Sequence, residues 1–418
     1  MKYYIIAGEA SGDLHGSNLI KELQKLDLAA DIRCWGGDMM QSTGATLVKH
    51  YRDLAFMGFT EVIMNLKTIL SNLKFCKEDI LKFKPDVLVL IDYPGFNLRI
   101  AEWAKGISNK EFEISKEEKN ASSNSQLKTG NSKLKTVFYI SPQVWAWKES
   151  RVPKMKKCID KMIVILPFEK EYYKNKWNWA VDYVGHPLVE VVEQFKVDSL
   201  KLKQLDDTLN MQSSISNIEQ EAENSKLKTQ NFIALLPGSR KQEIKKKLPI
   251  MLQVSKAFPQ YQFVLAKAPA LEDEFYASFM QHYTNVSSVR NKTYELLMQS
   301  KAALVTSGTA TLETALFGVP EVVCYKGSKI SYEIAKRLIK IKFISLVNLI
   351  MDRPVVKELI QDDLTVENIK KELSLLLFDE SKKQLVKNDY DDLKNVLSGN
   401  GNASANAAAI ILKTVSQT

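Results

Sequence analysis

The stretch YYIIAGEASGDLHG at residues 3–16 places a short apolar run, typical of a buried strand, directly before a turn of small residues and an amphipathic segment. The stretch FIALLPGSR at residues 232–240 repeats this arrangement in the second half of the chain. A buried parallel strand that ends in glycine and opens a helix directs backbone N–H groups and the positive end of the helix dipole at whatever binds there. Two such turns predict two nucleotide-binding halves that face a common cleft.

Strand-like runs alternate with helical patterns through most of the chain. The runs are short and apolar on both sides, as expected of parallel strands that helices cover on both faces. The segments between them are long enough for crossover helices, so we expect an α/β fold with doubly wound parallel sheets. Besides the first run, the clearest ones lie at residues 32–35, 87–91, 137–140, 162–165, 232–236, 263–265, 302–305 and 321–324.

The length of 418 residues favours two domains, followed by a helical tail. We expect Rossmann-like domains at residues 1–187 and 188–378 and the tail at 379–418. Two tracts, near residues 109–135 and 206–230, are rich in Ser, Asn, Lys, Gln and Glu and share the hexapeptide NSKLKT. Because such tracts cannot bury enough apolar surface to order themselves, we expect them to be inserted surface loops.

Composition excludes several classes of protein. No apolar run reaches the ~18 to 20 residues of a membrane span, and the N-terminus enters a strand without a secretory signal pattern. The four cysteines are far apart and form no CxxC pair, which favours reduced residues of a cytoplasmic protein. The histidines show no metal-ligand spacing either, so we expect no metal, and we expect no cofactor. The net charge of +9 is typical of proteins with phosphate-bearing or membrane partners, and equally of a lysine-rich solvated surface. The basic residues are dispersed among acids, which argues against nucleic acid.

The segment SGTATLE at residues 307–313 is a second candidate phosphate-binding turn in the C-terminal half. Its small residues let a diphosphate approach the backbone, and its hydroxyls can cap the helix or bond phosphate. Glu313 falls where a carboxylate can accept both hydroxyls of a ribose, although an ordinary capped helix has the same pattern. Arg240 offers a planar fork of donors suited to phosphate. The candidate residues in this half are Gly238, Ser239, Arg240, Ser307, Gly308, Thr309 and Glu313.

The segment IDYPGFN at residues 91–97 ends a strand of the N-terminal half. An aspartate at the carboxyl end of a buried parallel strand points into the crevice where ligands bind, so Asp92 is a candidate general base. A plain turn of the Asp-x-Pro-Gly type is an equally good interpretation. Trp145 is a candidate to line a sugar or acyl pocket, or it fills a core. His186 is a candidate hinge residue between the domains, although a lone histidine there is more often structural. The candidate cleft residues in this half are Gly8, Glu9, Ser11, Gly12, Asp13, Asn97, Trp145 and His186.

Taken together, these segments resemble the lipid-A-disaccharide synthase family, which are inverting glycosyltransferases of the GT-B type. The resemblance spans nearly the whole chain in the family's order. The two polar tracts, which the family as a rule lacks, fall outside every matching segment. Gly95 stands where relatives often have an acid, so only Asp92 of that turn is carried over as a base. The matching segments are residues 8–13, 54–58, 91–97, 141–147, 166–169, 184–186, 235–240, 307–313 and 356–359.

The resemblance implies a metal-independent transfer of 2,3-diacylglucosamine from its UDP ester to 2,3-diacylglucosamine 1-phosphate. The products are UDP and the tetraacyl β-1,6 disaccharide 1-phosphate precursor of lipid A. In this reaction Asp92 would be the base, Arg240 and the turn at 307–309 would stabilise the leaving diphosphate, and Glu313 would bind the ribose. The main rival is an isomerase similar to UDP-N-acetylglucosamine 2-epimerase on the same fold, which needs several acids and a histidine around the hexose. A third alternative is a non-catalytic nucleotide-sugar binding protein. Loss of Asp92 or Arg240 would have favoured it, but both residues are present.

The resemblance also implies a homodimer that exchanges C-terminal elements, although a tail that folds back on its own chain fits the sequence too. We further expect peripheral binding to the cytoplasmic face of the inner membrane through the helix after Phe59. On one face of that segment Ile63, Met64 and Leu70 alternate with lysines at 67, 74 and 77, as in an interfacial helix. A partly solvated helix with scattered apolar residues is the alternative.

Overall fold

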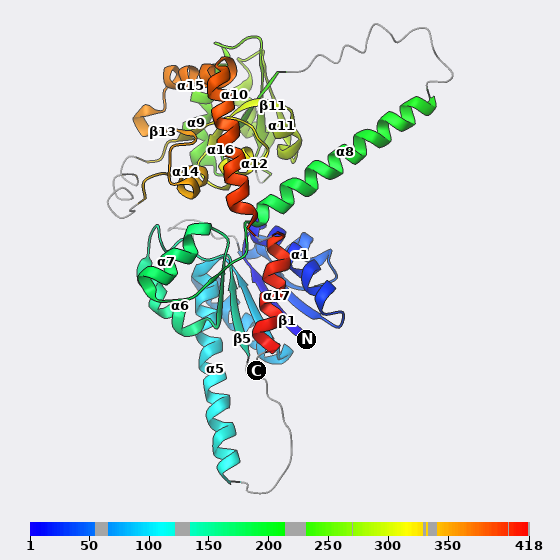
Figure 1. Ribbon diagram of the computed structural model, residues 1–418, viewed down its shortest axis with the longest axis vertical. Coiled ribbons are helices and arrows are strands. Elements are labelled where there is room, and N and C mark those ends of the chain that lie inside the picture. Colours follow the sequence, from blue (N-terminus) through cyan, green and yellow to red (C-terminus); the bar gives the residue numbers. More distant parts are fainter. Residues whose placement is uncertain are drawn as a thin grey trace. The chain divides into compact units, whose positions relative to one another are not determined.

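The computed structural model describes residues 1–54, 66–121, 134–213, 231–269, 271–328, 332, 341–399 and 401–416, with the backbone alone at 66, 108–121 and 203–213. The chain forms two compact units, each of which can be followed by colour in Figure 1. Unit 1 is Met1–Pro187 together with Ser398–Thr418, and unit 2 is Leu188–Leu397. The tail that we expected as a separate element at 379–418 is therefore divided between the units.

Unit 1 is built on a seven-stranded sheet whose strand pairs are all parallel. The strand order is β3-β2-β1-β4-β5-β6-β7, so the direction of strand addition reverses between β1 and β4. Such a reversal is the topological switch point at which doubly wound folds bind their ligands. The strands are β1 Lys2–Ala7, β2 Asp31–Gly36, β3 Thr46–His50, β4 Val87–Ile91, β5 Lys135–Tyr139, β6 Lys161–Val164 and β7 Asp182–Tyr183.

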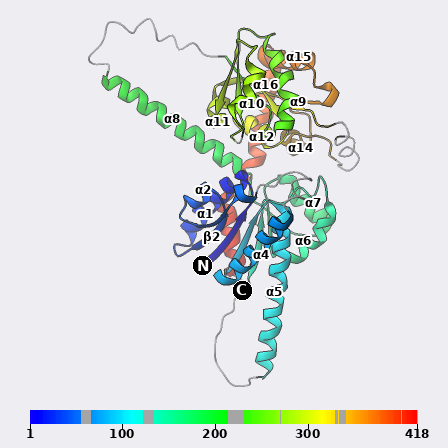
Figure 2. The same cartoon turned by 180° about the vertical axis from the view of Figure 1, so that it is seen from behind.

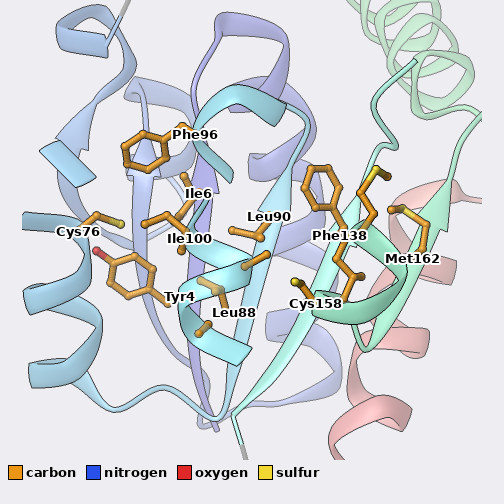
Figure 3. Close-up of a cluster of buried hydrophobic side chains, with 14 of the residues drawn as sticks. Tyr4, Ile6, Cys76, Leu88, Leu90, Phe96, Ile100, Phe138, Cys158 and Met162 are labelled. Atoms are coloured by element: carbon orange, nitrogen blue, oxygen red, sulfur yellow. The ribbon is translucent and has the colours of Figure 1, made fainter. Parts of the chain in front are cut away.

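Helices cover both faces of this sheet because its strands are apolar on both sides. Figure 3 shows one face, where Tyr4 and Ile6 of β1 and Leu88 and Leu90 of β4 pack against helix side chains such as Ile100. On the other face α1 contacts β1 and β2, and α17 contacts β5 and β6. The helices are α1 Ala10–Leu26, α2 Asp38–Gln41, α4 Leu66–Phe83, α5 Pro94–Ala121, α6 Val152–Cys158, α7 Pro167–Trp177 and α17 Ala403–Ser416, with 3-10 turns Tyr51–Leu54 and Glu149–Arg151.

Unit 2 repeats the architecture with a six-stranded parallel sheet in the order β10-β9-β8-β11-β12-β13. Its switch point lies between β8 and β11. The strands are β8 Phe232–Leu236, β9 Gln262–Lys267, β10 Val286–Arg290, β11 Ser300–Thr306, β12 Glu321–Tyr325 and β13 Lys357–Ile360. The helices are α8 Pro187–Ser213, α9 Lys241–Ser255, α10 Asp273–Met280, α11 Thr293–Gln299, α12 Thr309–Leu316, α14 Leu346–Met351, α15 Val366–Phe378 and α16 Glu380–Ser398, with a 3-10 turn Gln361–Asp363.

The last helix, α17, completes unit 1 although it is far from the rest of that unit in sequence. Both views of the chain show it beside α1, with which it shares its most extensive helix contact. Ala403, Ala407, Ala408 and Ile411 form its buried face. Small alanine side chains let the two helix backbones approach closely, and the helix covers strands that would otherwise expose an apolar face to water.

The two polar tracts begin differently from what their composition predicts. Helix α5 continues to Ala121 and helix α8 to Ser213, so the first part of each tract is helical rather than a loop. The first stretch, residues 109–121, is rich in Glu and Lys, which have good helix propensity. The second, residues 206–213, contains Leu, Met and Gln among residues of lower propensity. Residues 122–133 of the first tract and 214–230 of the second lie outside the described residues.

Candidate functional site

The turns predicted from the sequence lie at the switch points of the two sheets. In unit 1 the ends of β1 and β4 are adjacent, with Ala7 paired to Ile91. The turn that begins at Gly8 therefore lies beside the turn that begins at Asp92. In unit 2 Leu236 at the end of β8 pairs with Val305 of β11, which brings the turns at 237–240 and 306–309 together.

The turn after β4 has an unusual backbone. Asp92 and Tyr93 both have left-handed conformations, with φ of 43° and 48°. Each such residue other than glycine costs free energy, and such strain concentrates at functional sites. Asn97 holds the turn in place, since its amide Nδ2 donates to the Asp92 carbonyl at 2.8 Å and the Ile91 carbonyl at 3.2 Å.

Gly8 is required by this turn. A Cβ atom at Gly8 would lie 2.3 Å from Cγ of Tyr93, so only glycine lets the ring pack against the β1 turn. The close approach fixes Tyr93 and hence the neighbouring Asp92.

The Asp92 carboxyl group has a pKa raised to about 7. Burial is the main cause, the negative charge of Glu9 adds to it, and the backbone N–H of Tyr93 opposes both. Two carboxyl groups from adjacent turns therefore interact, as expected of β1 and β4 as sheet neighbours. A carboxylate with a pKa near neutrality is suited to accept a proton from a hydroxyl group.

Several residues that we expected to face a cleft are directed inward. The Asp13 carboxylate is buried and accepts the backbone N–H groups of Gly37, Met40 and Met39 at 2.7, 3.0 and 3.1 Å. It thus holds the β2–α2 turn, because backbone donors at a helix start attract an anion. Gly12 packs on Ala7, where a Cβ atom would lie at 3.1 Å.

Asn97 and His186 are also buried, so neither side chain is exposed to solvent. Burial, with a smaller effect from His15, lowers the pKa of His186 to about 3, which keeps the imidazole neutral. Ser11 and Glu9 retain exposure beside the turn.

Trp145 is fixed by an acid that sequence reasoning did not select. Its indole Nε1 donates to Glu169 Oε1 at 3.1 Å, and Glu169 Oε2 accepts the backbone N–H of Leu166 at 3.1 Å. Burial raises the pKa of Glu169 to about 8, and the charge of Asp92 contributes. Glu169 lies in the family-matching segment 166–169, three residues after Leu166 at a helix start, where Glu often caps.

In unit 2 two glycines with positive φ form the adjacent turns, Gly238 at 107° and Gly308 at 129°. Arg240 and Gly308 are the residues directly before α9 and α12, so both helices begin at this edge. Ser239 and Thr309 are exposed, and Ser307 is half-buried. Exposed helix starts with glycine turns are suited to bind an anion.

The two charged candidate side chains of unit 2 differ in exposure, since Arg240 is exposed and Glu313 is half-buried. Arg240 is 65% exposed and lies 3.4 Å from Glu243 Oε1. Glu313 accepts a hydrogen bond of 3.1 Å from the Tyr294 hydroxyl, and burial raises its pKa. Tyr294 thereby orients the Glu313 carboxyl group next to the helix start.

The fold of this chain is similar to the folds of two solved structures. UDP-GlcNAc 2-epimerase from Neisseria meningitidis, solved with UDP-GlcNAc bound, aligns with a TM-score of 0.58 and 12% identity over 100% of both chains. The calicheamicin glycosyltransferase CalG4 aligns with a TM-score of 0.57 and 13% identity over 100% of this chain and 98% of its own. These similarities show the GT-B-type fold.

Sequence comparison identifies the family. The family model described as lipid-A-disaccharide synthetase matches residues 3–112 and 117–415. Lipid-A-disaccharide synthase of Trichlorobacter lovleyi is 33% identical over 99% of this chain and 97% of its own length. Lipid-A-disaccharide synthase 1 of Legionella pneumophila strain Lens is 33% identical over 94% and 92%. The chain belongs to the lipid-A-disaccharide synthase family.

Proposed function

We propose that the protein transfers 2,3-diacylglucosamine from its UDP ester to O6 of 2,3-diacylglucosamine 1-phosphate. The products are UDP and the tetraacyl β-1,6 disaccharide 1-phosphate precursor of lipid A. Family membership supports the reaction class. The observation that carries the proposal at residue level is the Asp92 carboxyl group, which lies at a switch point with a pKa near neutrality.

In this proposal unit 1 binds the acceptor and supplies the base. Asp92 accepts the proton of the O6 hydroxyl while that oxygen attacks C1 of the donor sugar. The bond from C1 to the diphosphate oxygen breaks with its electron pair, and the configuration at C1 inverts. Gly8, Glu9, Ser11 and Trp145 lie on the acceptor side. Asn97 holds the Asp92 turn and Asp13 holds the β2–α2 turn. Gly12 packs on Ala7, and His186 is buried.

Unit 2 binds UDP in this proposal. Negative charge grows on the diphosphate as it leaves, and it is stabilised by Arg240, by the exposed turn residues and by the start of α12. Glu313, oriented by Tyr294, accepts the ribose hydroxyls. The diphosphate-binding turn residues are Gly238, Ser239, Ser307, Gly308 and Thr309.

The test is incubation of the purified protein with both diacylated substrates, followed by mass spectrometry for UDP and the disaccharide. A parallel incubation with UDP-N-acetylglucosamine alone tests the alternative epimerase function, which the shared fold with the Neisseria enzyme suggests. Disaccharide in the first reaction supports the proposal. If the second incubation gives N-acetylmannosamine products and the first gives no disaccharide, the epimerase function replaces the proposed one.

Arg240→Ala and Glu313→Ala should weaken UDP binding through different parts of the nucleotide. Loss of a charge-assisted hydrogen bond costs ~1.5 to 3 kcal/mol, so we expect about ten- to hundredfold weaker binding for Arg240→Ala. Glu313→Ala should lose its discrimination between UDP and an analogue without the ribose hydroxyls. Calorimetric titration measures both, with Lys245→Ala, an exposed residue of α9, as the control. Wild-type affinity in both variants would put the nucleotide elsewhere.

We propose that the protein binds the cytoplasmic face of the inner membrane peripherally through α4. Among the described residues no helix is long and apolar enough to cross a bilayer. Leu73, Cys76 and Ile80 form the buried face of α4, while Leu70 is 53% exposed beside the exposed Lys67 and Lys74. Apolar side chains between lysines suit an interface with anionic lipid.

Two residues of the expected lipid-binding face, Ile63 and Met64, lie outside the described residues, and Lys77 is directed elsewhere. Its Nζ lies 5.6 Å from the ring centroid of Trp103 in the same unit. The attraction of the ring for the ammonium group turns Lys77 toward its own chain. The lipid-binding face proposed here therefore depends on Leu70 and two lysines, together with Ile63.

An Ile63→Ser, Leu70→Ser double variant should co-sediment less with anionic phospholipid vesicles than the wild type at low salt. High salt should weaken both, because each lysine near the surface contributes ~1 kcal/mol through screened charge. Leu28→Ser is the matched control, since Leu28 is 95% exposed and lies between α1 and β2 of the same unit. If the double variant and Leu28→Ser co-sediment equally with the vesicles, the membrane contact lies on another surface.

We propose further that the protein is a homodimer formed through exchange of its C-terminal elements. In the single chain α17 packs on α1, and an exchanged helix would make the same contacts with the α1 of a second subunit. Light scattering at micromolar concentration should give twice the mass of the 47.5 kDa chain. A mass of one chain would exclude the exchange and leave α17 on its own unit.

A further inference from the structure

Lys247, in the second turn of α9, is an unusual lysine because its side chain is 2% exposed. Its Nζ contacts the Thr306 hydroxyl at the end of β11 and lies 3.5 Å from Glu243 Oε2. A buried ammonium group is costly unless it is paired and hydrogen-bonded. Burial accordingly lowers the pKa of Lys247, an effect that the nearby Glu243 carboxylate opposes.

The Lys247 ammonium group lies beside the Gly238 turn. A Cβ atom at Gly238 would lie 3.1 Å from Glu243 Oε2, 3.4 Å from Thr306 Cγ2 and 3.6 Å from Lys247 Nζ. Lys247 is thus directly beneath the turn that follows β8, and Thr306 ends β11 on the other side of the switch point. The charge lies at the carboxyl ends of two neighbouring strands, where a doubly wound fold binds its ligand.

The charges around this turn are unequal. One carboxylate, that of Glu243, contacts two cations, with Oε1 at 3.4 Å from Arg240 and Oε2 at 3.5 Å from Lys247. These three side chains together carry one net positive charge when ionised. A diphosphate above the turn would be attracted by the Lys247 ammonium group beneath it, and the low dielectric of a buried site strengthens that attraction.

We propose that Lys247 is a further nucleotide-binding residue, whose ammonium group stabilises the diphosphate from beneath the Gly238 turn. This inference rests on the proposed binding of UDP by unit 2. It differs from a purely structural role, in which Lys247 ties α9 to β11 through Thr306. The two roles predict opposite effects on stability, because an apolar side chain of similar volume often stabilises a site that held a buried charge.

The decisive variant is Lys247→Met, with Lys246→Met as the matched control. Lys246 precedes it on α9 and is exposed, so the two variants share the change of net charge and differ in position. UDP, UMP and uridine are titrated calorimetrically against each protein, and thermal unfolding is recorded. For Lys247→Met we expect about tenfold weaker UDP binding, a smaller loss for UMP and none for uridine, since one charge-assisted contact is lost. The melting temperature should be equal or higher, and Lys246→Met should match the wild type.

Lys247→Gln provides a second variant, which can still donate to Thr306 but carries no charge. The same selective loss of UDP binding in this variant supports the inference. A lower melting temperature with equal losses for all three ligands, or unchanged UDP binding, would overturn it in favour of a structural tether. Arg240→Ala distinguishes failure of the Lys247 role from failure of the proposed UDP site. If Arg240→Ala weakens UDP binding and Lys247→Met does not, only the role of Lys247 is wrong. If the wild type does not bind UDP, the proposed UDP site of unit 2 is wrong as well.

Discussion

Asp92→Asn should lower kcat about 10²- to 10⁴-fold and leave UDP affinity unchanged, because it removes the proposed base and nothing on unit 2. Asn is the appropriate replacement since Asp92 has a φ of 43°, a conformation that Asn tolerates better than most residues. Turnover of the two diacylated substrates and calorimetry with UDP measure the two effects. Asp53→Asn, with a side chain that is 55% exposed on the same unit, is the control. Turnover within a few-fold of the wild type would remove Asp92 from the mechanism.

The pH profile gives an independent signature of the same group. With a pKa of about 7, Asp92 is protonated in acid, so kcat/KM should fall about tenfold per pH unit below that value. Glu9→Gln removes a charge that raises the pKa, so the acid limb should move to lower pH. An acid limb that does not move in this variant would show that Glu9 does not act on the base.

Stability should change in the opposite direction to activity. The pKa of Asp92 is higher in the folded protein than its ordinary value of 3.8, so ionisation destabilises the fold progressively as the pH rises from about 4 to 7. Asp92→Asn should therefore melt at a higher temperature than the wild type at pH 8, with the difference vanishing below about pH 4. If Asp92 is retained for catalysis at a cost in stability, its replacement should give a more stable but inactive variant.

The sequence was sufficient to predict the interior of both sheets but not their edges. Every interior strand contains an apolar run, because helices cover both of its faces. The strands that we did not predict are β3, β7, β10 and β13, which are the outer strands of the two sheets. In β3 and β10, for example, no residue is fully buried, so the local sequence carries polar residues that hide the pattern.

The candidate site shows a similar division. The two kinds of turn and Asp92 could be predicted, since glycines and acids at strand ends are local signals. That Asp13 would turn inward depends on backbone N–H groups 24 or more residues away, which no local pattern reveals. The effect of Glu9 on Asp92 likewise requires that β1 and β4 be neighbours. Lys247 reads as one of three consecutive lysines, and only packing shows that it is buried.

Ala408→Asp should destabilise unit 1 strongly, because α17 covers β5 and β6 on the face shared with α1. Ala408 is 0% exposed, so the new carboxylate would be buried without a partner. An uncompensated buried charge costs ~3 to 5 kcal/mol, which corresponds to a loss of roughly 6 to 20 °C in the melting temperature of a unit of this size. Scanning calorimetry should show this loss in one transition, while the transition of unit 2 keeps its position.

Ala409→Asp is a closely matched control for this prediction. The two alanines are adjacent in the same helix, so the changes in helix propensity and in charge are nearly the same, but Ala409 is exposed. We expect its melting temperature to remain within about 2 °C of the wild type, as for most surface substitutions. The comparison holds whether α17 packs on its own chain or on a second subunit, because either arrangement buries the same face. Equal destabilisation by the two variants, or none by Ala408→Asp, would show that the apolar face of unit 1 does not need α17.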